Sequence, residues 1–237
     1  MATAQIKKVE LGILMDGHGI MFEQCSFGQS FKHSRLANPI HLISNHRDNS
    51  IRQIISSNPH IRAILLSGGD LDLLDQQSLP IQVLNRIKDI LSLIYELGVL
   101  PFYLPVLPRK NYRLELQGRV LENRSPRMFN MLGAWFREQI AEFGKTKLKY
   151  NPVIPIPFDI HLEKDGVYLS YKSYQNIALM AGVLIDLTLN LPPDWRHSAY
   201  KKALNYYHSQ RQNKRNWRDG VWLGARFDPC NPKEKNY

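Results

Sequence analysis

Three short polar blocks of the sequence carry residues that could do chemistry. They read "DGHG" at 16–19, "SGGD" at 67–70 and "DGVY" at 165–168. Histidine beside carboxylates can serve general acid–base catalysis or hold a divalent ion. The candidates for one joint site are Asp16, His18, Asp70, Asp72, His161 and Asp165. Because no two histidines stand at H-x-x-x-H or H-x-H spacing, structural roles are the favoured interpretation, and we expect no metal and no cofactor.

Apolar runs precede these blocks and predict the strands that would position them. The runs lie at 9–14, 61–66, 99–107 and 153–157, with a shorter one at 40–43. Nearly continuous apolar runs are typical of parallel strands covered on both faces. Between them, apolar residues at helical spacing predict helices over 50–57, 78–97, 126–140 and 173–190. The alternation predicts an α/β protein, a three-layer α/β/α sandwich with a central parallel sheet.

In their order and their strand-end placement, the three blocks resemble the signature blocks of the SGNH hydrolase family. The resemblance covers about residues 9–190 and implies a flavodoxin-like fold. Members of that family cleave esters with a Ser-His-Asp arrangement. The resemblance places Gly19 at the serine position, Asp70 at the oxyanion-donor position and Tyr168 at the histidine position, while Asp165 is retained.

These replacements remove the chemistry that the resemblance would otherwise imply. Glycine has no hydroxyl, and a carboxylate at the second position would repel a developing oxyanion. A tyrosine, with a reference pKa of about 10, is a poor general base at neutral pH. We therefore expect residues 1–194 to form an SGNH hydrolase-like domain that lacks catalytic residues and is not an enzyme.

The charge of the chain is concentrated at one end. The net charge is +10 in total, and residues 195–237 hold ten Lys or Arg against three acidic residues, a net charge of +7. Aromatic residues recur among these cations. Lys and Arg neutralise phosphates, and bases stack on aromatic rings. We expect residues 195–237 to be a basic, aromatic-rich extension that packs on or flanks the domain and binds RNA.

The residues predicted to bind RNA form two groups. The first group lies in the extension and comprises Lys201, Lys202, Arg211, Lys214, Arg215 and Arg218 for phosphates and Trp217, Trp222 or Tyr207 for stacking. The second group, expected in loops around the first block, comprises Lys32, His33, Arg35, Arg47 and Arg52.

A non-catalytic SGNH-like domain is known at the C-terminus of Oskar, the insect germ-plasm organiser, and this chain resembles it in its altered blocks and basic character. That resemblance implies binding of single-stranded messenger RNA together with protein partners of a ribonucleoprotein assembly. Two alternatives stay open. One is an ester hydrolase with a rearranged site, such as His18 or His161 with Asp165, of retroelement origin. The other is a protein-interaction scaffold whose basic end is incidental.

Several functional classes fit the sequence poorly. No apolar run approaches the roughly 20 residues of a membrane span, so no membrane partner is expected. The two cysteines, Cys25 and Cys230, cannot form a disulfide framework. The short apolar start breaks at Asp16 and Gly17, unlike a signal peptide. We expect a cytoplasmic protein.

Overall fold

A four-stranded parallel sheet forms the middle layer of the computed structural model, which describes residues 9–15, 18–36, 48–112, 115–116, 119–120, 124–157 and 160–212. The strands are β1 (Val9–Leu14), β2 (Phe31–Arg35), β3 (Ile61–Ser67) and β4 (Leu100–Leu104), in the spatial order β2-β1-β3-β4. Beyond β4, Val153 makes an isolated parallel bridge to Tyr103, at the place of a fifth strand. This order is the flavodoxin-like one.

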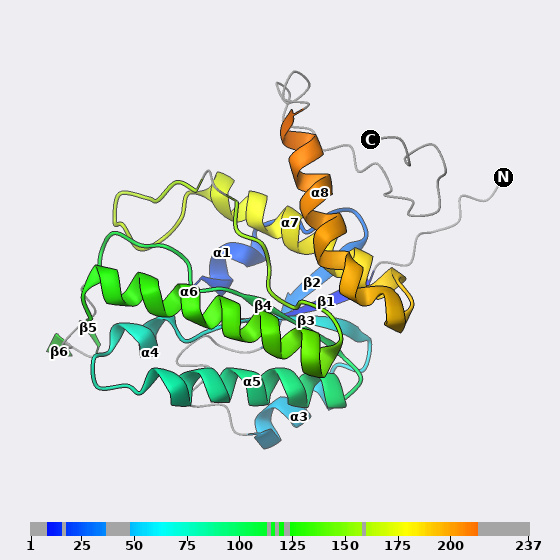
Figure 1. The fold of residues 1–237 in the computed structure, drawn as a ribbon, viewed down its shortest axis with the longest axis horizontal. Coiled ribbons are helices and arrows are strands. Elements are labelled where there is room, and N and C mark those ends of the chain that lie inside the picture. The colour runs from blue at the N-terminus through cyan, green and yellow to red at the C-terminus, as the bar shows by residue number, and fades with distance from the viewer. Residues whose placement is uncertain are drawn as a thin grey trace.

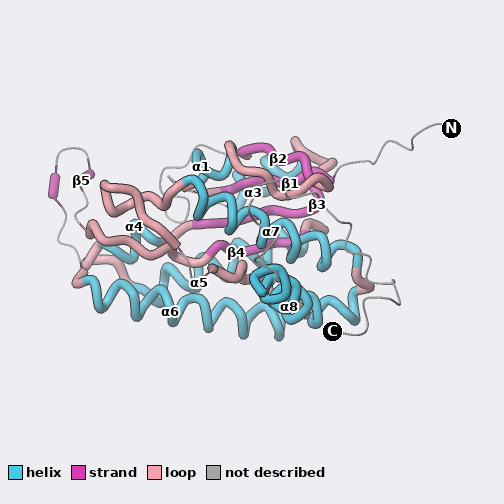
Figure 2. Tube along the Cα trace, turned by 90° about the horizontal axis from the view of Figure 1, so that it is seen from above, coloured by secondary structure: helices cyan, strands magenta, loops and turns pink. Residues whose placement is uncertain are grey.

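Helices cover both faces of the sheet (Figures 1 and 2). One face carries α1 (Gly19–Glu23) and α7 (Tyr171–Asn190), and α8 (Ala199–Gln212) packs against α7. The other face carries α3 (Asp48–Ser56), α4 (Asp70–Leu74), α5 (Pro80–Glu96) and α6 (Pro126–Phe143). The shorter elements are the hairpin of β5 (Glu115–Leu116) and β6 (Arg119–Val120), the π-helix η1 (Gly144–Leu148) and the 3₁₀ helix η2 (Pro193–Ser198). The predicted α/β/α sandwich is confirmed.

Strand alternation divides the core into two halves. In β1, Leu11 and Ile13 point to the half under α1 and α7, whereas Leu14 points to the half under α3, α5 and α6. In β3, Leu65 and Leu66 divide in the same way. All five side chains are almost completely buried. The near-continuous apolar runs of the sequence therefore reflect a sheet that is covered on both faces.

Helix α7 lies unusually close to the chain that follows α1. Its N-cap is Ser170, whose hydroxyl accepts from the backbone N–H of Ser173 at 3.3 Å. One turn of the helix presents Ala181 and Gly182 to the core, and a Cβ at Gly182 would overlap the carbonyl oxygen of Phe27. The small residues of this turn therefore allow α7 to pack directly against the backbone at Phe27.

Two strand predictions differ from the structure. The run at 153–157 forms one bridge rather than a strand, because Pro152, Pro155 and Pro157 cannot donate to a ladder. The sequence does not predict strand β2, because "FKHSR" is polar. Within the described residues β2 is an edge strand paired with β1, and an edge strand can keep polar side chains in water. The predicted strand at 40–43 lies outside the described residues, and the four predicted helices correspond to α3, α5, α6 and α7.

No helix in the described part of the chain combines the length and the apolar character required to cross a membrane.

Candidate functional site

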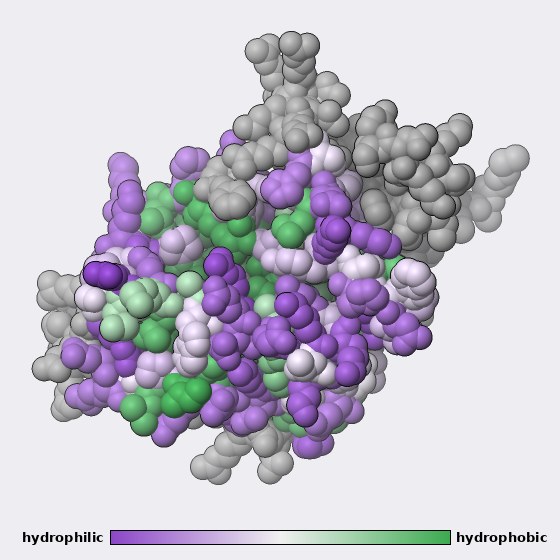
Figure 3. Space-filling model, in the orientation of Figure 1, coloured by the Kyte–Doolittle hydropathy of each residue, from purple (hydrophilic) through white to green (hydrophobic). Residues whose placement is uncertain are grey.

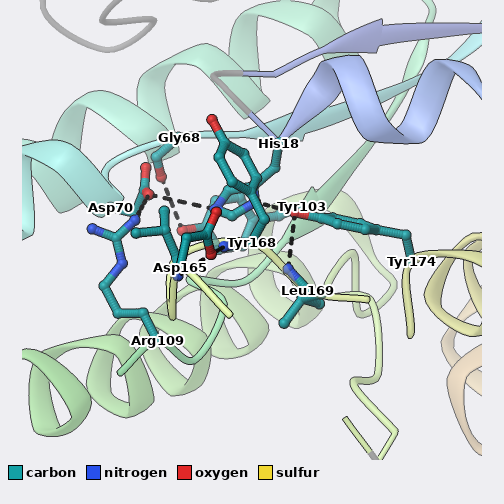
Figure 4. A network of polar contacts seen from close by, with 10 residues as sticks. His18, Gly68, Asp70, Tyr103, Arg109, Asp165, Tyr168, Leu169 and Tyr174 are labelled. Atoms are coloured by element: carbon teal, nitrogen blue, oxygen red, sulfur yellow. Dashed lines mark hydrogen bonds and ion pairs between the residues drawn. The ribbon is translucent and has the colours of Figure 1, made fainter. Parts of the chain in front are cut away.

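The polar blocks meet at the carboxyl edge of the sheet, as parallel strands require (Figure 4). His18 follows β1, Asp70 follows β3 and begins α4, and Arg109 follows β4. Tyr174 comes from the first turn of α7, and Tyr168 from the turn that precedes that helix. We call these five residues the carboxyl-edge cluster.

Asp70 and His18 form the centre of the cluster. The Asp70 Oδ2 atom lies 3.4 Å from Arg109 Nη2 and 3.7 Å from His18 Nε2. His18 Nδ1 lies 2.5 Å from the Tyr174 hydroxyl. His18 is 5% exposed, and Asp70 and Arg109 are each 7% exposed. A buried carboxylate is thus compensated by a buried guanidinium, and the imidazole bridges that pair to a phenol.

This row of hydroxyl, imidazole and carboxylate lacks an accessible nucleophile. Tyr174 is 0% exposed, and its hydroxyl also accepts the backbone N–H of Leu169 at 3.4 Å. Its ring packs edge-on against Phe22, with 5.2 Å between the ring centroids. A nucleophile must reach the substrate as well as its base, and this phenol is enclosed by the core.

The described cysteine is not available as a nucleophile either. Cys25 is buried, and its thiol donates to the Met21 carbonyl at 3.3 Å. Burial raises the pKa of this thiol to about 11, so it stays protonated at neutral pH.

The structure also explains the position that the resemblance gave to the serine. Gly19 is the first residue of α1, and a Cβ there would lie 2.9 Å from the Cβ of Met15. A serine at this position would force the backbone or Met15 to move. The side chain that the first block sends into the cluster is therefore His18.

The third block forms a turn. One oxygen of Asp165 accepts from the backbone N–H groups of Val167 at 2.8 Å and Tyr168 at 3.0 Å. Tyr168 is 37% exposed and lies edge-on to His18, with 5.5 Å between the ring centroids. The Asp165 carboxylate is engaged by its own turn, and the tyrosine in the histidine position covers the imidazole.

The six candidates for a joint site do not all converge. Among them, His18 and Asp70 are paired with each other. The side chain of His161 is exposed, and its backbone N–H donates to the Ser173 hydroxyl. Asp16 lies outside the described residues, and Asp72 uses its carbonyl to accept from Arg124. Over the described ranges, no group of three or more His, Cys, Asp or Glu side chains is arranged to hold a metal ion.

A second polar region lies at the opposite, amino edge of the strands. Both ribbon views place the start of α8 beside the C-terminal end of α6, which η1 continues in the chain (Figures 1 and 2). Burial raises the pKa of the Tyr200 phenol of α8, and the positive charge of Arg137 on α6 partly offsets this rise. We call the end of α6, η1 with Lys149, η2 and the start of α8 together the η1–α8 surface. The cations that these segments carry are Arg137, Lys145, Lys147, Lys149, Arg196, Lys201 and Lys202, of which Arg196 and Lys202 are half-buried.

Trp195 projects from the same surface. Its side chain belongs to η2 and is 61% exposed. Pro193 begins η2, the Trp195 N–H donates to the Pro192 carbonyl at 2.9 Å, and the Ser198 hydroxyl donates to the Trp195 carbonyl at 2.8 Å. The turn is thus held by its own hydrogen bonds, while the indole lies in solvent. Our sequence reasoning missed Trp195, although the Pro-Pro pair before it signals a rigid turn.

The predicted RNA-binding residues of the extension are only partly described. Lys201 is exposed and Lys202 half-buried on α8, Arg211 lies in the last turn of that helix, and half-buried Tyr207 contacts the His208 ring. The residues outside the described part are Lys214, Arg215, Trp217, Arg218, Trp222 and, in the second group, Arg47.

The second group does not lie in loops around the first block, as expected. Lys32, His33 and Arg35 belong to edge strand β2, and Arg52 to helix α3. Lys32 lies 3.7 Å from the Glu10 carboxylate, which reduces its charge toward a ligand. His33 Nε2 lies 3.0 Å from the Glu23 carbonyl oxygen. Successive positions of a strand alternate between its two faces, so Lys32 and His33 belong to opposite faces of β2.

Comparison with known proteins adds little to this geometry. No family model matches the chain, and no curated protein matches it. Among solved structures, the chain is similar to a GDSL-like lipase from Bacteroides thetaiotaomicron, with 13% sequence identity and a TM-score of 0.46. The match covers 76% of this chain and 89% of the lipase chain. The comparison concerns the fold alone, and no residue role is taken from it.

Proposed function

We propose that this protein is a non-catalytic RNA-binding module that holds single-stranded RNA on the η1–α8 surface. The observation that carries the proposal is Trp195, a large aromatic side chain left 61% exposed in the short helix that leads into the basic helix α8. An indole in solvent is a stacking platform for an unpaired base, and neighbouring Lys and Arg neutralise the phosphates.

The charge of this surface supports a polyanionic ligand. Together η2 and α8 hold Arg196, Lys201, Lys202 and Arg211 against one acidic residue, Asp194. Three further lysines follow one another at alternate positions in and after η1, and Lys145 among them is paired with Glu142 at 3.4 Å. Such one-sided charge costs stability through self-repulsion, and a phosphate backbone would relieve that cost.

The carboxyl-edge cluster supports the non-catalytic part of the proposal. The hydroxyl beside His18 is a buried phenol, the Asp165 carboxylate is engaged by its turn, and a side chain at Gly19 would force Met15 or the backbone to move. The messenger RNA ligand, the protein partners of a ribonucleoprotein assembly, a role in germ plasm and the cytoplasmic location belong to the same proposal. They rest on the resemblance drawn from the sequence.

Fluorescence anisotropy of a labelled single-stranded RNA of about 12 nucleotides tests the proposal at two salt concentrations, about 50 and 200 mM. We expect saturable binding that weakens with salt, and a loss of about 10- to 100-fold in affinity for the double variant Lys201→Glu, Lys202→Glu. The matched control is Lys164→Glu, an exposed lysine in the turn before α7. No binding by the full chain, or equal losses in both variants, would refute the proposal.

An ester hydrolase with a rearranged site is the second candidate, and one observation favours it. His18 Nε2 lies 3.7 Å from the Asp70 carboxylate, at the sheet edge where functional residues gather. Turnover of a generic aryl ester that disappears in His18→Ala, with an unchanged circular dichroism spectrum, would support it. Absence of turnover above the rate of the His18→Ala variant is the result that our proposal predicts.

A further inference from the structure

An open groove runs along one side of α6. Its volume is about 450 Å³, within the range of small-molecule sites. One wall is the loop after β4, residues 105–108, and the other includes Ile156, Pro157 and Ile160. The floor is the face of α6 that carries Asn130, Gly133, Ala134 and Arg137, at the spacing of neighbouring turns. None of the described residues that line the groove is acidic.

The lining suits a flat, partly polar ring with an attached anion. Pro105, Pro108 and Pro157 present apolar ring surfaces, and Phe129 closes the groove from below with 1% exposure. Asn130 brings an amide, which offers donors and an acceptor to the edge of a ring. Arg137 brings a guanidinium, which binds phosphate in a bidentate manner. A long aliphatic chain would use neither of these polar groups.

Arg137 connects the groove to the η1–α8 surface. It lines the groove from α6, and its charge acts on the Tyr200 phenol of α8. Figure 3 shows this face of the molecule, with green apolar residues gathered on the left, toward the carboxyl edge of the strands, and purple hydrophilic residues more frequent to the right. A chain lying on the basic surface would therefore reach the groove by way of Arg137.

We infer that the α6 groove takes one unstacked nucleotide of a single-stranded RNA, with the base between the prolines and the phosphate on Arg137. The inference rests on the proposed function for the polymer, and it adds a base-binding site that the proposed function does not contain. Single-stranded RNA is recognised through bases turned out of the stack, which apolar and amide groups can hold.

The direct test uses nucleoside monophosphates and the full chain, observed by ¹H–¹⁵N NMR. We expect AMP, CMP, GMP or UMP to shift backbone resonances of α6 at residues 130–137. The variant Ala134→Phe fills the groove and should abolish these shifts. The matched control Met131→Phe places the same ring on an exposed position of the same helix outside the lining, and it should keep them. If Ala134→Phe does not fold, Arg137→Gln is the second variant and should weaken the shifts.

The RNA titration separates failure of the groove from failure of the proposed function. We expect Ala134→Phe to lose roughly 5- to 150-fold in RNA affinity, the value of one stacked base, while Met131→Phe binds as the unmodified chain does. RNA binding that Ala134→Phe leaves unchanged would overturn the groove and spare the basic surface. Nucleotide shifts in α6 without RNA binding would support the groove and overturn the basic surface. Shifts caused by N-acetyltryptophanamide but by no nucleotide would overturn the groove in favour of a protein side chain.

Discussion

The charged side chains are buried at one edge of the sheet and mostly exposed at the other. At the carboxyl edge, Asp70, Arg109 and His18 are buried and compensate one another. At the amino edge, the cations of the η1–α8 surface lie mostly in solvent, and the indole of Trp195 is exposed as well. Charges that satisfy each other inside a fold contribute to its structure, whereas charges left uncompensated outside are available to a ligand. In the proposed function, the carboxyl edge, where parallel-sheet proteins usually bind their ligands, holds a buried charge cluster and the ligand binds at the opposite edge.

Removal of Asp70 tests the first half of the comparison, with the largest expected effect. Asp70→Ala leaves the Arg109 guanidinium buried without its carboxylate, which costs about 3–5 kcal/mol of the free energy of unfolding. Urea denaturation measures this loss, and Asp89→Ala, at an exposed position of α5, is the control. RNA affinity of the folded variant should stay within about twofold, because distant sites act independently. A parallel loss of RNA affinity would break the comparison.

Replacement of Trp195 tests the second half. Trp195→Ala should weaken RNA binding by about 1–3 kcal/mol, the contribution of one stacked base, and leave the unfolding midpoint unchanged because the side chain is exposed. Trp195→Phe keeps an aromatic face and should retain most of the affinity. The opposite pattern, a stability loss with unchanged RNA affinity, would make Trp195 a structural residue.

Substitution of lysines in and directly after η1 tests how far the basic surface extends. Lys147→Glu with Lys149→Glu should lower RNA affinity about tenfold at low salt, and the log–log salt slope should become shallower by about 0.7 for each lost phosphate contact. Unchanged affinity in anisotropy titrations would restrict the surface to η2 and α8.

Asp186 on α7 gives the smallest effect and contrasts with Asp70. Burial raises the pKa of this carboxyl above its ordinary value of 3.8, against the hydrogen bond from the Asn190 amide. The folded state therefore favours the neutral form, and the cost of the charge at pH 7 disappears as pH falls through the raised pKa toward 3.8. Asp186→Asn should melt slightly higher than the unmodified chain at pH 7, and this advantage should shrink near pH 4. A lower Tm at pH 7 would show that the carboxylate is compensated after all.

The sequence predicts the sheet where the chain is buried on both faces and fails where it is not. The apolar runs of β1, β3 and β4 predict buried strands. The polar residues Lys32 and Ser34 interrupt the apolar pattern in edge strand β2, so the sequence does not predict it. Proximity of His18 and Asp70 follows from parallel strands, because their carboxyl ends share an edge. Tyr174 could not be assigned to the cluster, since a tyrosine on an apolar helix face looks like core. The sequence does not single out Trp195, because its exposure depends on how η2 turns against α8.

Ultraviolet crosslinking of the full chain to single-stranded RNA, with the adducts located by mass spectrometry, tests the central claim most directly. The account predicts adducts on Trp195 and on residues 196–202. Adducts confined to Tyr168, Tyr174 or His18 would mean that the RNA occupies the carboxyl edge, and would contradict it.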